Sequence, residues 1–427
     1  MNALKKLFGG NTRQFGMIFA LVALIIFFQI ATEGRTLTSG NVINLFNGNS
    51  YILILAIGMV LVIIAGHIDL SVGSVAAFVG VTVALAIRDW DLPWYAGVLL
   101  GLLLGALIGA WQGWWTAYVG IPAFIVTLAG MLLFRGLNQF VGKSNTIPVP
   151  EDFQYLGAGY LPEVGPDTGY NNLTLLIGIA AAAFVIVGEL RSRARAKALG
   201  ADVPEMWIMV LKLVLISGAI LYATYLFATG RPGTSFPIPG LILAVLVLLY
   251  GFISSRTVLG RHVYAVGGNR HAAELSGVQS KKVNFLVMMN MSILAGLAGM
   301  IFVGRSTASG PFDGVGWELD AIAAVFIGGA AVTGGVGTVV GSIIGGLVMA
   351  VLNNGLQLLG VGADLTQIIK GLVLLIAVAF DVYNKSQGKK SIIGMLTRNI
   401  NRPTGGPSNP LQPDETTSTK EAIAREA

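Results

Sequence analysis

The chain has 427 residues, of which 54% are apolar and only 11% are charged. Soluble globular proteins carry about 25% charged residues, so this chain lacks the charge that keeps a folded surface in water. The composition excludes a soluble enzyme, a nucleic-acid binder and an intrinsically disordered protein. The 57 glycines lie inside runs of Leu, Ile, Val and Ala, as in packed transmembrane helices. The net charge of +6 is therefore read first as information on membrane topology.

Apolar segments that could cross a bilayer recur along the chain, and each crossing needs about 20 apolar residues. Twelve segments qualify: 14–31, 51–66, 71–87, 94–119, 121–142, 173–189, 207–228, 237–254, 283–303, 319–333, 338–359 and 366–384. The first has no cleavage site after it and is expected to remain as an anchor. We predict an all-α, polytopic membrane protein with about 12 transmembrane helices.

Positive charges near the ends of these segments predict the orientation. Lys5, Lys6 and Arg13 place the N-terminus in the cytoplasm. The connections 190–206 and 255–282 are basic and 143–172 is acidic, so twelve alternating crossings put the basic connections inside and the acidic one outside. Both termini are then cytoplasmic. Residues 1–385 are predicted to form the transmembrane domain, and residues 386–427 a disordered cytoplasmic tail.

An internal repeat is visible when 97–134 is aligned with 337–374 without a gap. Gly97, Gly101 and Gly105 then fall on Gly337, Gly341 and Gly345, and Gly120 falls on Gly360. In the predicted topology the first copy starts outside and the second starts inside. The sequence therefore predicts inverted repeats, which are typical of transporters, with the helix pair 173–228 as an insertion between them. Locally, the same glycine spacing is also ordinary helix packing.

Metal and cofactor chemistry has few candidate residues. With no cysteine and three histidines, the chain cannot form disulfides or Cys-ligated metal sites. Gly142-Lys143-Ser144 resembles the end of a phosphate-binding loop, but five residues separate it from Gly136 where four are required. We expect no metal, no cofactor and no ATP site in this chain.

Polar side chains at membrane depth are costly and mark candidate functional residues. Asp69 and Ser71 lie between the second and third segments, and Asp320 lies at a similar place in the other half. The glycines beside them indicate broken or re-entrant helices whose ends line a cavity. The two aspartates could instead cap helices by binding the first free N–H groups, and both roles remain open.

Amide and aromatic side chains inside the segments complete this set. Gln112, Asn353 and Asn354 could hydrogen-bond a hydroxylated solute or simply link neighbouring helices. Trp111 could stack on a sugar ring or belong to an interfacial aromatic belt. The candidate translocation path comprises Asp69, Ser71, Trp111, Gln112, Asp320, Asn353 and Asn354.

Four stretches resemble the permease subunit of bacterial monosaccharide ABC importers, the ribose, xylose and galactose group. They are GMVLVIIAGHIDLSVGSVAAF (58–78), IPAFIVTLAGMLLFRG (121–136), YAVGGNRHAAELSGV (264–278) and ELDAIAAVFIGGAAVTGGVGTVVG (318–341). The resemblance covers about 1–385, and the helix pair 173–228 makes the chain most similar to the D-xylose and multiple-sugar permeases. His67 and Ala330-Ala331 depart from the usual residues of the group, which leaves the exact sugar open.

The resemblance implies a sugar importer in the bacterial plasma (inner) membrane that is not itself an enzyme. Its expected partners are a second permease copy, a cytoplasmic ATP-binding cassette subunit, an extracytoplasmic sugar-binding protein and the lipid bilayer. The loop 255–282 would hold the helix that docks into the ATPase, a short helix opened by Asn269 and ended by Gly277. The implied coupling residues are Gly268, Asn269, Arg270, Ala272, Ala273, Glu274, Ser276 and Gly277.

An ion-coupled secondary sugar transporter, working without an ATPase, is the alternative. Such a carrier needs an acid–base chain near the membrane midplane. Lys370 and Asp381 share a face of the last segment, but they are too far apart to touch.

Overall fold

The computed structural model describes residues 12–386 apart from 202, 204 and 232. Lys5, Lys6 and residues 387–427 of the predicted tail lie outside the described residues. Residues up to Ala379 belong to one compact unit, and all contacts given below lie within it. Of the second unit, Phe380–Ala427, the structure describes only the end of one helix.

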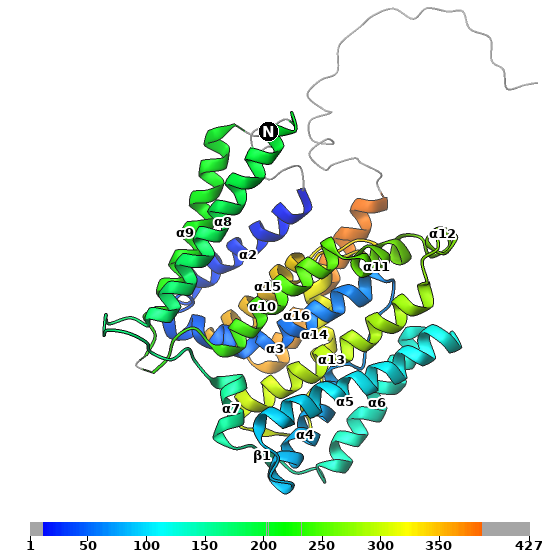
Figure 1. The fold of residues 1–427 in the computed structure, drawn as a ribbon. Helices are drawn as coiled ribbons and strands as arrows, with labels where there is room; N and C mark the ends of the chain where they lie inside the picture. Colours follow the sequence, from blue (N-terminus) through cyan, green and yellow to red (C-terminus); the bar gives the residue numbers. More distant parts are fainter. Residues whose placement is uncertain (1–11, 202, 204, 232, 387–427) are drawn as a thin grey trace, which may run out of the picture. The chain divides into compact units, whose positions relative to one another are not determined.

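Helices dominate the described part of the chain, which confirms the all-α class (Figure 1). The first helices are α2 (Thr12–Ala31), α3 (Ser39–Ile64), α4 (Val72–Asp89), α5 (Trp94–Trp114), the π-helix η1 (Trp115–Val119), α6 (Ala123–Val141), α7 (Glu151–Ala158), α8 (Asn172–Ala198) and α9 (Met206–Ala228). They are followed by α10 (Ile238–Arg256), α11 (Val258–Gly268), α12 (Arg270–Leu275), α13 (Ser280–Ser306), α14 (Trp317–Ile327), α15 (Val339–Leu358) and α16 (Ala363–Ser386). Two short strands, β1 (Ile147–Pro148) and β2 (Ala308–Ser309), pair antiparallel.

Nine of the helices described are long and apolar enough to cross a membrane. Each of the twelve predicted segments falls on a helix, but α2, α14 and α16 are not among those nine. The count of about twelve crossings therefore stays a prediction. The predicted segment 319–333 was too long, because α14 has only 11 residues, about 16 Å. It ends at Gly328, and Gly329 follows with a φ of 81°, a backbone conformation that does not continue a helix.

The helix α3 begins twelve residues before the predicted segment 51–66, at Ser39. Its first half contains four asparagines and therefore scores as too polar for a membrane span. It ends at Ile64, and Gly66 follows with a φ of 86°. The predicted break between the second and third segments is therefore present, at 65–71.

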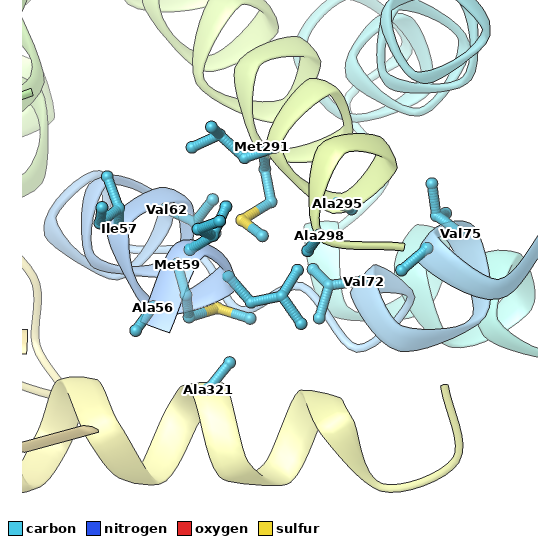
Figure 2. Packing of buried hydrophobic residues seen from close by; sticks show 14 of the residues in the cluster. Ala56, Ile57, Met59, Val62, Val72, Val75, Met291, Ala295, Ala298 and Ala321 are labelled. Carbon is cyan, nitrogen blue, oxygen red and sulfur yellow. The ribbon is translucent and has the colours of Figure 1, made fainter. Parts of the chain in front are cut away.

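The buried core lies where α3, α4, α13 and α14 meet (Figure 2). Figure 2 shows Met59 of α3, Val72 of α4 and Met291 of α13 converging, with Ala321 of α14 across from Met59. All four side chains are almost completely buried. Burial of this kind stabilises by about 25 cal/mol per Å² of apolar area when the reference state is water.

The helices α3–α6 and the helices α13–α16 form two sets of four. Both sets have the same order along the chain, but their orientations are opposite. The helices α3 and α13 run antiparallel, because Gly48 near the start of α3 lies against Arg305 at the end of α13, while Gly58 lies against Met291. Each of them also packs on the opposite set: α3 contacts α14 and α15, and α13 contacts α4 and α5. This is the arrangement that inverted repeats produce.

The two sets meet at Gly73 and Gly314. Gly73 lies in the first turn of α4, and Gly314 lies just before α14. A Cβ built on Gly73 would lie 2.1 Å from Gly314 O, and one built on Gly314 would lie 2.1 Å from Gly73 O. Each glycine thus lies directly against the backbone of the other set. Only glycine permits this backbone-to-backbone approach.

The predicted glycine register is present in both copies. Gly120 and Gly360 both adopt positive φ, 89° and 75°, directly after the third helix of each set. Gly105 brings α5 against the backbone of α13, where its Cβ would lie 2.6 Å from Ser292 O. Gly345 brings α15 still closer to α14, where its Cβ would lie 2.0 Å from Ala324 O. The glycines thus serve helix packing within a repeated framework.

The helices α8 and α9, from the predicted insertion, pack on each other (Figure 1). Thr224 of α9 fills the space over Gly178 of α8, where a Cβ would lie 2.0 Å from Thr224 Oγ1. An ion pair between Lys212 and Glu189, 2.9 Å long, joins the same two helices.

Candidate functional site

A polar cavity of about 790 Å³ lies between α3, α13, α15 and α16. We call it the amide cavity, because six of its lining side chains are amides. Its walls are Asn44, Leu45, Gly48, Asn49, Arg305, Asn353, Asn354, Gln357, Val361, Ala363, Thr366, Gln367 and Lys370. Two of these side chains are cations, and none is a carboxylate. A smaller cavity of about 420 Å³, beside the end of α9, shares Asn44.

One end of α3 contributes two of the six amides of the amide cavity. Gly48 and Asn49 lie four and five residues after Asn44, so all three border the cavity from one side of the helix. The second half of α3, from Ile52 to Ile64, is apolar and fully buried. The polar first half can exist in a membrane protein because it borders a cavity and protein instead of lipid.

Asn353 and Asn354 both line the amide cavity, but they differ in their partners. The side chains of Asn354 and Asn41 exchange two hydrogen bonds, of 2.8 and 2.9 Å, which join α15 to α3. Asn353 Oδ1 is buried and has no partner. Asn354 is thus a link between helices, whereas the acceptor of Asn353 is buried without a protein partner.

Asp320 lies in the first turn of α14 and binds a cation of the amide cavity. Lys370 Nζ of α16 lies 2.5 Å from Asp320 Oδ1. The interpretation of Asp320 as an N-cap was wrong, because Gly316 occupies the cap position of α14. Gly316 has a φ of 82°, and the helix begins at the next residue, Trp317. Sequence reasoning had considered Lys370 only with Asp381, whose side chain lies outside the described residues.

Asp69, Ser71 and Gln112 form a separate network that lies away from the amide cavity. All three side chains are fully buried. Asp69 Oδ1 accepts from the N–H and the hydroxyl of Ser71, at 2.8 and 2.7 Å, and Gln112 Nε2 donates to Ser71 Oγ at 2.9 Å. The interpretation of Asp69 as an N-cap was wrong, because Ser71 holds the cap position of α4 and Asp69 binds Ser71 instead of the first free N–H groups of the helix.

This network is closed by α6. A Cβ on Gly130 would lie 2.5 Å from Gln112 Nε2, so glycine is required for the amide to reach Ser71. Trp111, beside Gln112, is 41% exposed, and its ring packs edge-on against that of Phe134 with 6.1 Å between the ring centroids. Six of the seven predicted path residues therefore fall into two places, the network and the amide cavity with its neighbour Asp320, and Trp111 borders neither.

The predicted short helix in the loop 255–282 is present as α12. Asn269 caps it by accepting a hydrogen bond from Ala272 N at 3.0 Å. Gly277 lies just after its end and has a φ of 84°. Ala273 is buried against the protein, whereas the other predicted coupling residues of this turn are exposed. Gly268 directly precedes the cap.

Glu274 fixes the shape of this loop. It pairs with Arg270 Nε at 2.9 Å and accepts a short hydrogen bond from Ser280, the first residue of α13. The Ser280 hydroxyl and then the Arg270 guanidinium hold the pKa of Glu274 below its usual value, so the carboxylate is ionised at neutral pH. Leu275, which sequence reasoning did not single out, is 79% exposed at the end of α12.

The amide cavity and α12 lie at opposite ends of the structure. Asn44 and Asn49 belong to the start of α3, while Ile64 at its other end touches Gly267, just before α12. The helix has 26 residues, about 39 Å, which is long enough to separate the two faces of a membrane.

The fold and these two ends define a multi-pass membrane subunit of a transport system. The chain belongs to the family described as the permease component of the branched-chain amino acid transport system, which matches residues 41–378. It is 39% identical over 383 residues to the xylose transport system permease protein XylH of Haemophilus influenzae, covering 90% of this chain and 99% of that protein. The corresponding XylH of Escherichia coli K12 is 38% identical over 378 residues, 88% of this chain and 93% of that protein.

The ribose import permease protein RbsC of Escherichia coli K12 is also similar, with 34% identity over 370 residues, 86% of this chain and 94% of that protein. No solved structure is a significant match to this chain.

Proposed function

We propose that this chain is the membrane subunit of an ATP-driven importer for a monosaccharide, D-xylose or a related pentose or hexose. The observation that carries the proposal is the amide cavity. Side-chain amides both donate and accept, as sugar hydroxyl groups do, so they can bind a neutral polyol without burying a net charge. The volume of about 790 Å³ is in the range of small-molecule sites.

The similarity to xylose and ribose permeases supports the same substrate class. Labelled D-xylose uptake into cells that express this chain with an ATPase and a sugar-binding protein tests the proposal. We expect uptake that excess pentose inhibits and excess leucine does not. Inhibition by leucine and not by any sugar would overturn the sugar assignment.

The ATP-binding cassette subunit is proposed to dock on α12. Support comes from the capped, six-residue helix, its exposed Leu275 and the ordered Arg270–Glu274 pair. The proposed contact set is Gly268, Asn269, Arg270, Ala272, Ala273, Glu274, Ser276 and Gly277. ATP hydrolysis then belongs to that partner, and this chain contributes the path.

The remaining partners are proposed on the same basis. A sugar-binding protein would deliver the solute at the end of the structure that holds the amide cavity. A second copy of this chain would complete the membrane unit, and lipid would cover exposed apolar faces such as Leu99, Leu103 and Leu107 of α5. Because the chain has no cysteine, single introduced cysteines and cross-linking can test the homodimer directly.

Asn353→Leu is expected to lower the initial rate of D-xylose uptake about tenfold, because one hydrogen bond to the sugar is worth roughly 1–1.5 kcal/mol. Its neighbour provides the matched comparison. Asn354→Leu should mainly destabilise the protein, since it removes both hydrogen bonds that join α15 to Asn41. Uptake rates and thermal unfolding midpoints of both purified variants check the prediction. An Asn353→Leu variant with unchanged uptake would remove this residue from the path.

A further inference from the structure

We propose that Asp320 and Lys370 form the gate of the amide cavity, and that α14 opens and closes this gate in response to movement of α12. The two residues are called the gate pair below. They are positioning residues for transport, because they act by holding or releasing a wall of the cavity. The inference rests on the proposed docking of the ATPase at α12.

The gate pair joins a wall of the cavity to α14. Lys370 lines the cavity from α16, and its ammonium lies 2.5 Å from Asp320 Oδ1. Both side chains are about one-fifth exposed. A pair in this half-buried position is held firmly, yet water that enters the cavity can replace either partner. Such a contact can be broken and re-formed in every transport cycle.

The helix α14 is built to move as a short rigid piece. It starts after Gly316 and ends at Gly328-Gly329, with positive φ at Gly316 and Gly329. Its first turn also carries Glu318, whose carboxylate lies 3.8 Å from Arg135 of α6. Between these ends it packs on α3 and α15. Glycine-rich ends allow the backbone rotation that a hinge requires.

The far end of α14 leads to the coupling loop. Gly335 N donates to Ile64 O at 2.8 Å. A Cβ on Gly335 would lie 2.7 Å from Gly268 Cα, and one on Gly334 would lie 2.9 Å from Gly267 O. Gly268 directly precedes the cap of α12. The backbones are packed so tightly that α12 cannot shift towards Gly334 and Gly335 without displacing them.

These contacts form one physical connection from α12, through 334–335 and α14, to the gate pair. In the state described here the pair is formed and the amide cavity is present. Docking or ATP binding that pushes the coupling loop is expected to turn α14 and separate Asp320 from Lys370. The wall formed by α16 is then released, and access to the cavity changes.

The absence of native cysteine makes access to the cavity measurable. Thr366→Cys places a thiol in the cavity wall, one helical turn before Lys370. The importer, assembled with its ATPase in proteoliposomes, is labelled with a membrane-impermeant maleimide, with and without a non-hydrolysable ATP analogue. In the Thr366→Cys parent we expect labelling rates in the two states to differ about fivefold or more, since the nucleotide shifts the population between them.

Adding Asp320→Asn or Lys370→Gln should reduce this ratio of labelling rates to less than about twofold. The double variant should show no further reduction, because each substitution removes the same contact. Asp320→Glu, which keeps the charge, should restore the ratio. Glu189→Gln, which removes the Lys212 pair between α8 and α9, should leave it unchanged.

Retention of the ATPase in a pull-down shows that each variant is folded and assembled. A full nucleotide response in assembled Asp320→Asn or Lys370→Gln, or additive losses in the double variant, would overturn the gate pair. Loss of the response already in the Thr366→Cys parent would instead overturn the proposed coupling at α12.

Discussion

Glu274→Arg is expected to abolish sugar uptake while the chain remains in the membrane at normal amounts. The substitution removes the acceptor of Ser280 and places a guanidinium beside Arg270, so α12 loses the contacts that order it. Lys281 and Lys282 follow closely and add to the repulsion. We expect at least about a hundredfold loss of uptake, in line with removal of several contacts at a small interface. Uptake assays, together with recovery of the ATPase in a pull-down on this chain, measure the effect.

Glu189→Arg is the matched control for this variant. It also reverses a glutamate that pairs with a cation, here Lys212, but it lies between α8 and α9. Uptake and recovery of the ATPase should stay within about twofold of the wild type, since exposed ion pairs contribute little. Wild-type uptake by the Glu274→Arg variant would show that the ATPase does not dock on α12.

Gly73→Ala is expected to prevent formation of the folded protein. The added methyl group would lie 2.1 Å from Gly314 O and 2.9 Å from Glu318 Oε2, inside the contact between the two sets of helices. In the state described here neither backbone has room to retreat, because α4 and α14 are packed into the buried core. Overpacking a core costs about 1–3 kcal/mol, and more where the backbone itself must move. The yield of monodisperse protein and its thermal unfolding midpoint in detergent measure the outcome.

The same substitution at Gly136 is the control. Gly136 is exposed on α6, and a Cβ there would meet nothing within 4 Å. Gly136→Ala should be neutral or slightly stabilising, because alanine favours helix over glycine by roughly 1 kcal/mol. Equal stability of Gly73→Ala and Gly136→Ala would contradict the close contact at the centre of the repeats.

Local signals predicted the helical segments and α12 well. Apolar runs identify helices whose neighbours are lipid or apolar protein, and all twelve runs fall on helices. The cap Asn269 and the terminating Gly277 act on residues next to them, so the limits of α12 are visible in the sequence. The register of Gly120 and Gly360 was likewise visible and has the same structural role in both copies.

The amide cavity could not be predicted in the same way, because it depends on contacts between distant residues. Asn41 and Asn354 are 313 positions apart, and Asp320 binds Lys370 from another helix. The asparagines at the start of α3 also lower its hydropathy. Its first half was therefore predicted to connect two apolar segments and not to belong to one. A polar helix face in a membrane protein is identifiable only once the other walls of its cavity are known.

Reconstitution of this chain with its ATPase and sugar-binding protein in liposomes tests the central claim most directly. The account predicts accumulation of labelled D-xylose, or of a related monosaccharide, that requires all three proteins and ATP and that collapse of the ion gradients does not affect. Uptake by this chain alone, driven by a proton or sodium gradient without ATP, would contradict it.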